Sequence, residues 1–155
     1  MAYCKVDDVN TLKGDLTLPQ ATEIDNFIER ASSDIDAALS ERYQVPITTT
    51  NETTVSILKA ITSSLACGRM VLAIAIASED TSTQAYGRAL IRRAIEGEGQ
   101  AIGLRELREG RFILPGATLK SGLTSANLFA LRISSPKPDG VSDKSYFEYF
   151  YESFR

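Results

Sequence analysis

The chain has 155 residues, a length typical of one domain with a single core, and a formal net charge of −3. It has no histidine and only two cysteines, Cys4 and Cys67, so a disulfide framework and a zinc site both lack their usual ligands. The longest apolar segment, residues 65–77, contains Arg69 and is shorter than the roughly 20 residues that span a bilayer; no secretory signal opens the sequence. We therefore expect a cytosolic protein without a membrane, metal or cofactor.

The first long helix is predicted over residues 20–43, after a short helical turn within residues 6–12. Apolar residues recur at intervals of three and four from Ile24 to Tyr43, which is the pattern of one buried helical face. Pro46 lacks a backbone donor and disfavours helix at the residue before it. The helix is therefore expected to end near Tyr43.

A second helix is predicted over residues 53–78. Its second half, "MVLAIAIA", is apolar on every side and should be covered all round by other elements. Small residues along the helix would let neighbouring helices approach closely: Ala60, Ser64, Gly68, Ala73 and Ala77. The inward face of its first half is expected to carry Val55, Leu58, Ile61 and Leu65.

A third helix is predicted over residues 82–96, with capping candidates at residues 80–82. Arg88 and Arg92 stand one turn apart and should face solvent. Gly97 is expected to end the helix, before a further helical turn within residues 100–110. The inward stripe of this helix is expected to carry Tyr86, Ala89, Leu90 and Ala94.

Beyond residue 110 no helical period holds. Short β-branched and aromatic runs, "RFIL" and "LFALRIS", alternate with proline and glycine, which predicts one or two short strands. The fold class expected is all-α: a small bundle of three to four helices over residues 1–110, with an extended C-terminal arm containing short strands over residues 111–155.

No catalytic constellation emerges from the sequence. Ser56 and Lys59 match S-x-x-K, and residues 120–122 resemble a K-T-G element, but penicillin-binding enzymes need a longer chain and a third element. Without histidine, the commonest proton carrier near neutral pH is missing. We therefore expect a protein that is not an enzyme.

Charge is unevenly distributed along the chain. Residues 1–80 hold twelve acidic and six basic side chains, whereas residues 81–111 hold six arginines against four acids. An acidic protein has no general attraction for nucleic acid. The arginine-rich part could dock a partner's carboxylates or, as the alternative function, serve a small DNA-binding or packaging accessory protein.

Half of the twelve aromatic residues lie in the last eleven positions, "SYFEYFYESFR". Aromatic side chains are preferred anchors of protein interfaces, so this tail is expected to pack on another chain; folding back on its own core is the alternative. Both helix and strand remain open for it. The expected partner or subunit interface comprises Tyr146, Phe147, Tyr149, Phe150, Tyr151, Phe154, Phe129, Arg88 and Arg92.

The order of these helices resembles the head-to-tail connector (adaptor) proteins of tailed double-stranded DNA bacteriophages. "IERASSDIDAALSERYQVPI" is similar to that family's first long helix, with Ile35, Asp36, Leu39, an Arg-Tyr pair and then Pro46. "LKAITSSLACGRMVL" and "AYGRALIRRAIEGEGQAIGL" resemble its second and third helices. The resemblance covers roughly residues 3–105.

The resemblance implies a structural virion protein at the head-tail interface, assembled in the host cytoplasm. Such proteins form a ring, usually twelvefold, that docks on the portal and offers a platform for stopper or tail-completion proteins. DNA would pass through the lumen without specific binding. An acidic surface, for example Asp25, Glu29 and Asp36, would suit such a lumen because it repels DNA.

Overall fold

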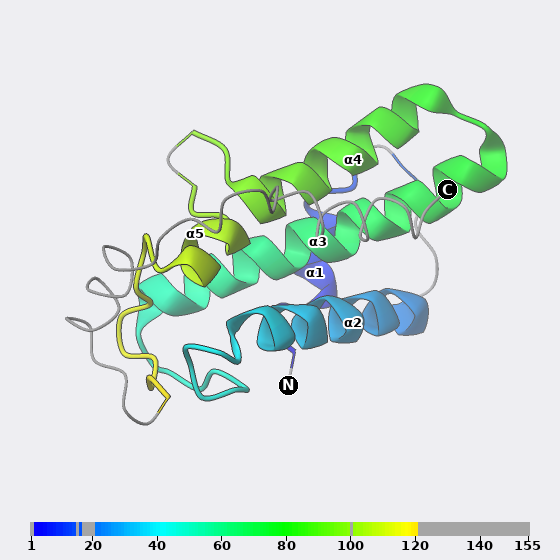
Figure 1. Cartoon of the computed structure of the whole chain (residues 1–155). Coiled ribbons are helices and arrows are strands. Elements are labelled where there is room, and N and C mark those ends of the chain that lie inside the picture. Colours follow the sequence, from blue (N-terminus) through cyan, green and yellow to red (C-terminus); the bar gives the residue numbers. More distant parts are fainter. Residues whose placement is uncertain (1, 15, 17–20, 100, 121–155) are drawn as a thin grey trace.

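The computed structural model describes residues 2–14, 16, 21–99 and 101–120 (Figure 1). These residues form helices and connecting loops without a β-strand, which confirms the predicted all-α bundle. Three helices are long and two are short. They are α1 (Val6–Asn10), α2 (Ala21–Leu39), α3 (Glu52–Ser78), α4 (Thr81–Glu96) and α5 (Leu104–Glu109).

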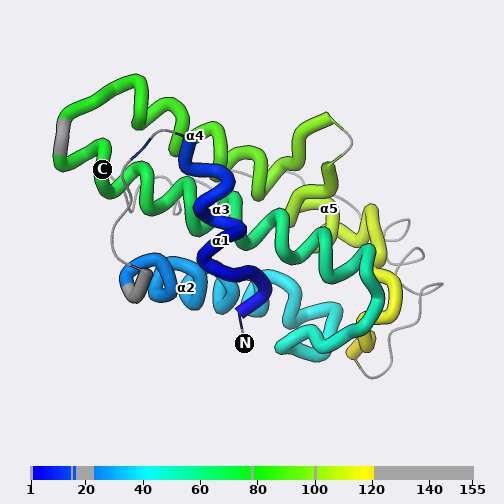
Figure 2. The backbone as a smooth tube through the Cα atoms, turned by 180° about the vertical axis from the view of Figure 1, so that it is seen from behind, coloured from blue at the N-terminus to red at the C-terminus, as the bar shows by residue number. Residues whose placement is uncertain are grey.

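Helix α3 is the centre of the bundle. α2 packs along one side of it and α4 along the other, while α1 crosses α2 and α3 on the back (Figures 1 and 2). As a result, all residues from 61 to 72 are buried. The predicted core positions Leu58, Ile61 and Leu65 are each 2% exposed, so the helical period located this part of the core correctly.

Two buried polar side chains of α3, Thr62 and Arg69, have partners inside the helix or on a neighbouring helix. The Thr62 hydroxyl donates to the Leu58 carbonyl oxygen at 2.6 Å, which removes the cost of burying an unpaired hydroxyl. Arg69 lies in the core with its guanidinium 2.5 Å from the Asp34 carboxylate on α2. The Arg69–Asp34 ion pair therefore joins α3 to α2 at the surface of the core.

Helices α3 and α4 meet backbone to backbone at two glycines. A Cβ on Gly68 would lie 2.9 Å from the Gly87 carbonyl oxygen and 2.8 Å from Ile91 Cγ1. A Cβ on Gly87 would lie 3.0 Å from the Gly68 carbonyl oxygen and 2.9 Å from Leu72 Cγ. Gly68 thus provides the close approach expected of it, whereas Ala60, Ala73 and Ala77 are exposed.

The connection from α3 to α4 is tight. Glu79 adopts a left-handed conformation (φ 56°) at the end of α3, and Asp80 caps α4, as predicted. The Asp80 carboxylate accepts from the backbone N–H groups of Ser82 and Thr83 at 3.0 and 3.3 Å. These bonds, together with those from the two hydroxyls, lower the Asp80 pKa to about 2, the Thr83 hydroxyl having the largest effect.

Three predicted inward positions are wrong. Val55 is 46% exposed and Tyr86 41% exposed, and Ala89 faces solvent. On α4 the buried stripe is instead Gly87, Leu90, Ile91, Ala94 and Ile95, because the contact with α3 is centred on Gly87. The C-terminal turns of α3 are not covered all round either, since Ile76 is 51% exposed.

One end of the bundle, here called the loop end, consists of residues 40–51 and 110–120. α2 ends at Leu39 and not near Tyr43, because residues 42–44 pair with residues 118–120 instead of continuing the helix. The Gln44 N–H donates to Thr118 O and the Lys120 N–H to Arg42 O, both at 2.9 Å. Among the described residues, this antiparallel bridge between Tyr43 and Leu119 is the one place where two extended backbone segments pair.

The "RFIL" run, residues 111–114, forms no strand. Leu114 is 1% exposed in the core, and its N–H donates to the Tyr43 hydroxyl at 3.1 Å. The buried Thr54 hydroxyl donates to Pro115 O at 2.6 Å. Residues 111–120 therefore pack on the bundle through side-chain and backbone bonds, while the second run, "LFALRIS", lies outside the described residues.

By length and composition, one helix within the described ranges, Glu52–Ala77, could cross a membrane. Of its most apolar window, 67% is buried inside the protein. Its neighbours α1, α2 and α4 provide that cover, which is the environment of a core helix.

Candidate interaction surface

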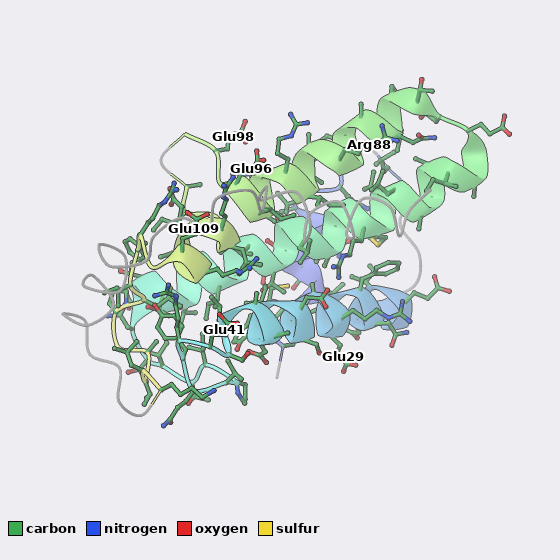
Figure 3. The ribbon with its side chains drawn as sticks, in the orientation of Figure 1. Glu29, Glu41, Arg88, Glu96, Glu98 and Glu109 are labelled. Carbon is green, nitrogen blue, oxygen red and sulfur yellow. The ribbon has the colours of Figure 1, made fainter. Side chains whose placement is uncertain are left out.

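The exposed face of α4 carries two of the residues predicted for an interface. Arg88 and Arg92 are exposed and one helical turn apart, as expected (Figure 3 labels Arg88). In the part of the chain that the structure describes, neither guanidinium forms an ion pair, whereas Arg93 lies 3.7 Å from Glu98. Within the described ranges, these two arginines are therefore exposed and unpaired.

Small apolar residues lie between these arginines and Arg93 on the surface of α4. Ala85 and Ala89 are exposed and occupy the line opposite the buried stripe centred on Gly87. The sequence pattern placed Ala89 on the inward face, because an alanine fits either face of a helix. The signal that could have located this outer line is Gly87, since a helical glycine often marks the closest helix contact.

The opposite edge of the molecule, along α2, is acidic. Its 19 residues hold five acidic side chains and one arginine, and Glu23, Asp25 and Glu29 are exposed. Figure 3 shows Glu29 on this edge, across α3 from Arg88. Asp36 is partly buried, and its carboxylate accepts a hydrogen bond from the Tyr3 hydroxyl. Of the acidic surface proposed from the sequence, Asp25 and Glu29 are therefore the more accessible part.

Lys59 of the S-x-x-K match and Lys120 of the K-T-G-like element both have structural contacts. Ser56 is exposed in the first turns of α3, and Lys59 Nζ lies 2.6 Å from Asp8 Oδ1 on α1. Burial alone would raise the Asp8 pKa, but the bonds from Lys59 and from the Lys5 backbone outweigh it and lower that pKa. Lys120 donates to Ser40 O at 3.2 Å in the loop end.

Both cysteines are buried and free. Burial raises the pKa of Cys4 to about 12 and that of Cys67 to about 11. A thiol that stays protonated is a poor nucleophile and metal ligand. Among the described residues, no group of three or more Asp, Glu or Cys side chains could hold a metal ion.

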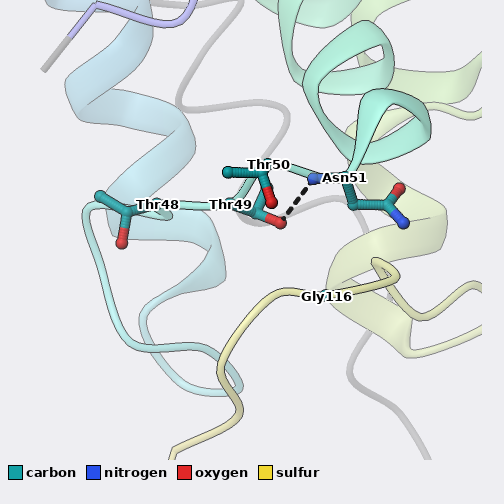
Figure 4. Close-up of a pocket in the computed structure, with 5 residues that line it drawn as sticks. All are labelled: Thr48, Thr49, Thr50, Asn51 and Gly116. Carbon is teal, nitrogen blue, oxygen red and sulfur yellow. Dashed lines mark hydrogen bonds between the residues drawn. The ribbon is translucent and has the colours of Figure 1, made fainter.

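A shallow hollow opens at the loop end between residues 48–51 and Gly116 (Figure 4). Its polar groups have structural partners: the Asn51 N–H donates to Thr49 Oγ1 at 3.1 Å, and Asn51 Oδ1 accepts from the Thr54 N–H at 3.2 Å as the cap of α3. The lining residues carry no charged or strongly nucleophilic group. The hollow therefore offers no evident chemistry for a substrate.

The aromatic residues of the predicted interface lie outside the described residues. They are Phe129, Tyr146, Phe147, Tyr149, Phe150, Tyr151 and Phe154. Of the predicted interface, the structure therefore describes Arg88 and Arg92 alone, on one face of α4.

Comparison with known proteins bears on the bundle. Residues 3–118 match the model of a protein family described as bacteriophage Mu, Gp36. No curated protein and no solved structure matches the chain. The matched residues include all five helices and most of the loop end. Since they make up most of the sequence, the chain belongs to the bacteriophage Mu Gp36 family.

Proposed function

We propose that the protein is a head-tail adaptor: a structural virion protein whose helical bundle forms a ring docked on the portal. The ring would continue the DNA channel and provide a platform for the stopper or tail-completion protein. The protein would act without catalysis, in the host cytoplasm during assembly and at the head-tail interface of the virion.

The observation that carries this proposal is the phage family match over residues 3–118. It spans the part of the chain whose helices resemble those of head-to-tail connectors. The surface chemistry supports the same role, because exposed charged side chains lie on the outer faces of α2 and α4. The aromatic residues between Tyr146 and Phe154 supply anchors for a neighbouring subunit or the portal.

Loss of the protein from its phage tests the proposal. Infected cells should then accumulate heads and complete tails that do not join, and supplying the wild-type protein should restore joined particles. Electron microscopy of the lysate reads this directly. The purified protein should also bind the phage's own portal in a ring visible in the same way. Joined particles in the absence of the protein would contradict an adaptor role.

DNA binding through Arg88, Arg92 and Arg93 is the second candidate, favoured by their exposure on one helix. It predicts binding to duplex DNA that weakens steeply with salt and is lost when all three are changed to alanine. Replacing Arg30, an exposed arginine of the acidic helix α2, is the matched control. Absence of binding at low salt would eliminate this candidate.

A further inference from the structure

We propose that copies of this chain associate head to tail, with the arginine face of α4 on one copy packed against the acidic face of α2 on the next. The α4 face is Ala85, Arg88, Ala89 and Arg92; the α2 face is Asp25, Glu29, Ser33 and Ala37. The inference rests on the proposed function in that it specifies the contact between subunits of the ring.

Charge complementarity identifies the occupant of the α4 face. In the described part of the chain, Arg88 and Arg92 have no carboxylate partner, and Asp25 and Glu29 have no cationic one. Each pair is spaced by four residues, so the charges in both pairs are one helical turn apart. Two arginines on one helix can therefore meet two carboxylates on another, and arginine suits such pairs.

Shape supports the same match. Each of the two faces includes two small, exposed residues: Ala85 and Ala89 on α4, and Ser33 and Ala37 on α2. Small residues let two helix backbones approach closely, as Gly68 and Gly87 do inside the bundle. The flanking charges would then pair across a short distance at the rim of the contact.

The positions of the two faces determine the kind of assembly. α2 and α4 lie on opposite sides of α3, so one copy cannot join its own two faces (Figures 1 and 3). Contact between two different faces is heterologous, and repeating it closes into a ring or continues as a filament. A contact of α2 with α2 or of α4 with α4 would place like charges together.

Cysteine cross-linking tests which faces meet. A mixture of the Glu29→Cys and Arg88→Cys full-length chains should form disulfide-linked dimers on mild oxidation at high protein concentration. Each variant alone should form few, because its new thiols would lie on like faces. The native Cys4 and Cys67 are buried with raised pKa values, so they should not compete. A mixture of Glu29→Cys with Ser56→Cys, exposed at the start of α3, is the matched control.

Reversing the charges on each face is the second test of the contact. Arg88→Glu/Arg92→Glu and Asp25→Lys/Glu29→Lys should each weaken self-association by about tenfold or more, because attraction becomes repulsion. Mixing the two variants should restore association in alternating assemblies, since each reversed face then meets its complement. Sedimentation of the separate and mixed proteins measures both effects, and circular dichroism checks that each variant remains folded.

The outcomes separate this inference from the proposed function. Cross-links that form only between two copies of the same cysteine variant would overturn the α2–α4 contact, as would a lack of rescue on mixing the charge-reversed variants. Either result would do so even if the protein proves necessary for joining heads to tails. Specific cross-links and rescue, together with normal joining in phage lacking the protein, would leave the contact standing and remove the adaptor role. Unchanged self-association of the Arg88→Glu/Arg92→Glu variant, even if this variant no longer binds DNA, would also count against the contact.

Discussion

Single side chains connect distant parts of the chain, and Tyr3 does so most clearly. Its hydroxyl donates to the Asp36 carboxylate on α2 and accepts from the buried Ile47 N–H at 2.8 Å. Burial, followed by the hydrogen bond to Asp36, raises the Tyr3 pKa well above its usual range. One hydroxyl therefore joins the N-terminal segment, α2 and the loop end.

Tyr3→Phe should lower the free energy of unfolding by about 1–3 kcal/mol, because the Ile47 N–H would be left buried without a partner. Chemical denaturation near neutral pH measures the loss. Phe112→Leu, at a partly buried position of the loop end, provides a control for packing changes that leave these hydrogen bonds intact. Equal losses in the two variants would show that the Tyr3 hydroxyl contributes nothing specific.

The raised Tyr3 pKa also predicts a pH dependence. A folded pKa above the ordinary value of 10.0 means that the folded state holds the proton more tightly than the unfolded chain. The stabilisation that follows from this tighter binding is complete below pH 10.0 and is lost as the pH rises above it. Wild-type stability should therefore fall more steeply above pH 10.0 than that of Tyr3→Phe. Parallel curves would contradict this assignment.

For the helices, the sequence predicted their positions in the chain better than it predicted which of their side chains face inward. The periods of α2, α3 and α4 placed each helix within a few residues, and Asp80 and Gly97 mark the two ends of α4 as predicted. The predicted inward face of α4 was wrong at Tyr86 and Ala89, and it did not include Gly87. Only the structure shows that the helix backbones touch at Gly87. Hydropathy alone does not reveal such a contact.

Gly87→Ala should destabilise the bundle by about 1–3 kcal/mol, despite the higher helix propensity of alanine, because the added Cβ collides with Leu72 and the Gly68 carbonyl. The midpoint of thermal or urea unfolding measures this. Ala89→Ser adds one atom on the exposed face of the same helix and should change stability by about 0.5 kcal/mol or less. A stabilised Gly87→Ala protein would mean that α3 and α4 pack less closely than described.

Asp80→Ala should lower the melting temperature, since the first turn of α4 loses the acceptor of its N–H groups. Asp80→Ser should retain most of the cap. The depressed pKa of Asp80 also predicts how stability depends on pH. The stabilisation by the Asp80 carboxylate is present above its ordinary pKa of 3.8 and is lost as the pH falls towards about 2. The difference in melting temperature between wild type and Asp80→Ala should therefore shrink over that interval.

For the whole molecule, the family match and the described core share nearly the same residues, 3–118 and 4–114. The sequence identified the interface candidates by residue type, aromatic and arginine. It could not show that α2 and α4 occupy opposite edges, because that depends on how three helices stack. The acidic face of α2 becomes a possible partner of Arg88 and Arg92 only once that arrangement is known.

Deleting residues 145–155 should leave helicity and cooperative melting largely intact, because the core of the described residues is built from positions 4 to 114. Assembly with the portal should be lost if the aromatic tail anchors a neighbouring chain. Circular dichroism and pull-down with portal measure the two effects. Replacing only Glu148 and Glu152 by glutamine provides a control that keeps the aromatic residues. Loss of cooperative unfolding in the truncated protein would instead support a tail folded on its own core.

The loop end joins residues that are far apart in the chain, whereas α2, α3 and α4 pack with their immediate neighbours in sequence. Tyr43 bridges to Leu119, and its hydroxyl meets Leu114, 71 residues away. Contacts between near neighbours form quickly, while closing long loops is slow. During synthesis the three long helices can therefore pack as soon as α4 is made. The loop end is then the last part of the described fold to close.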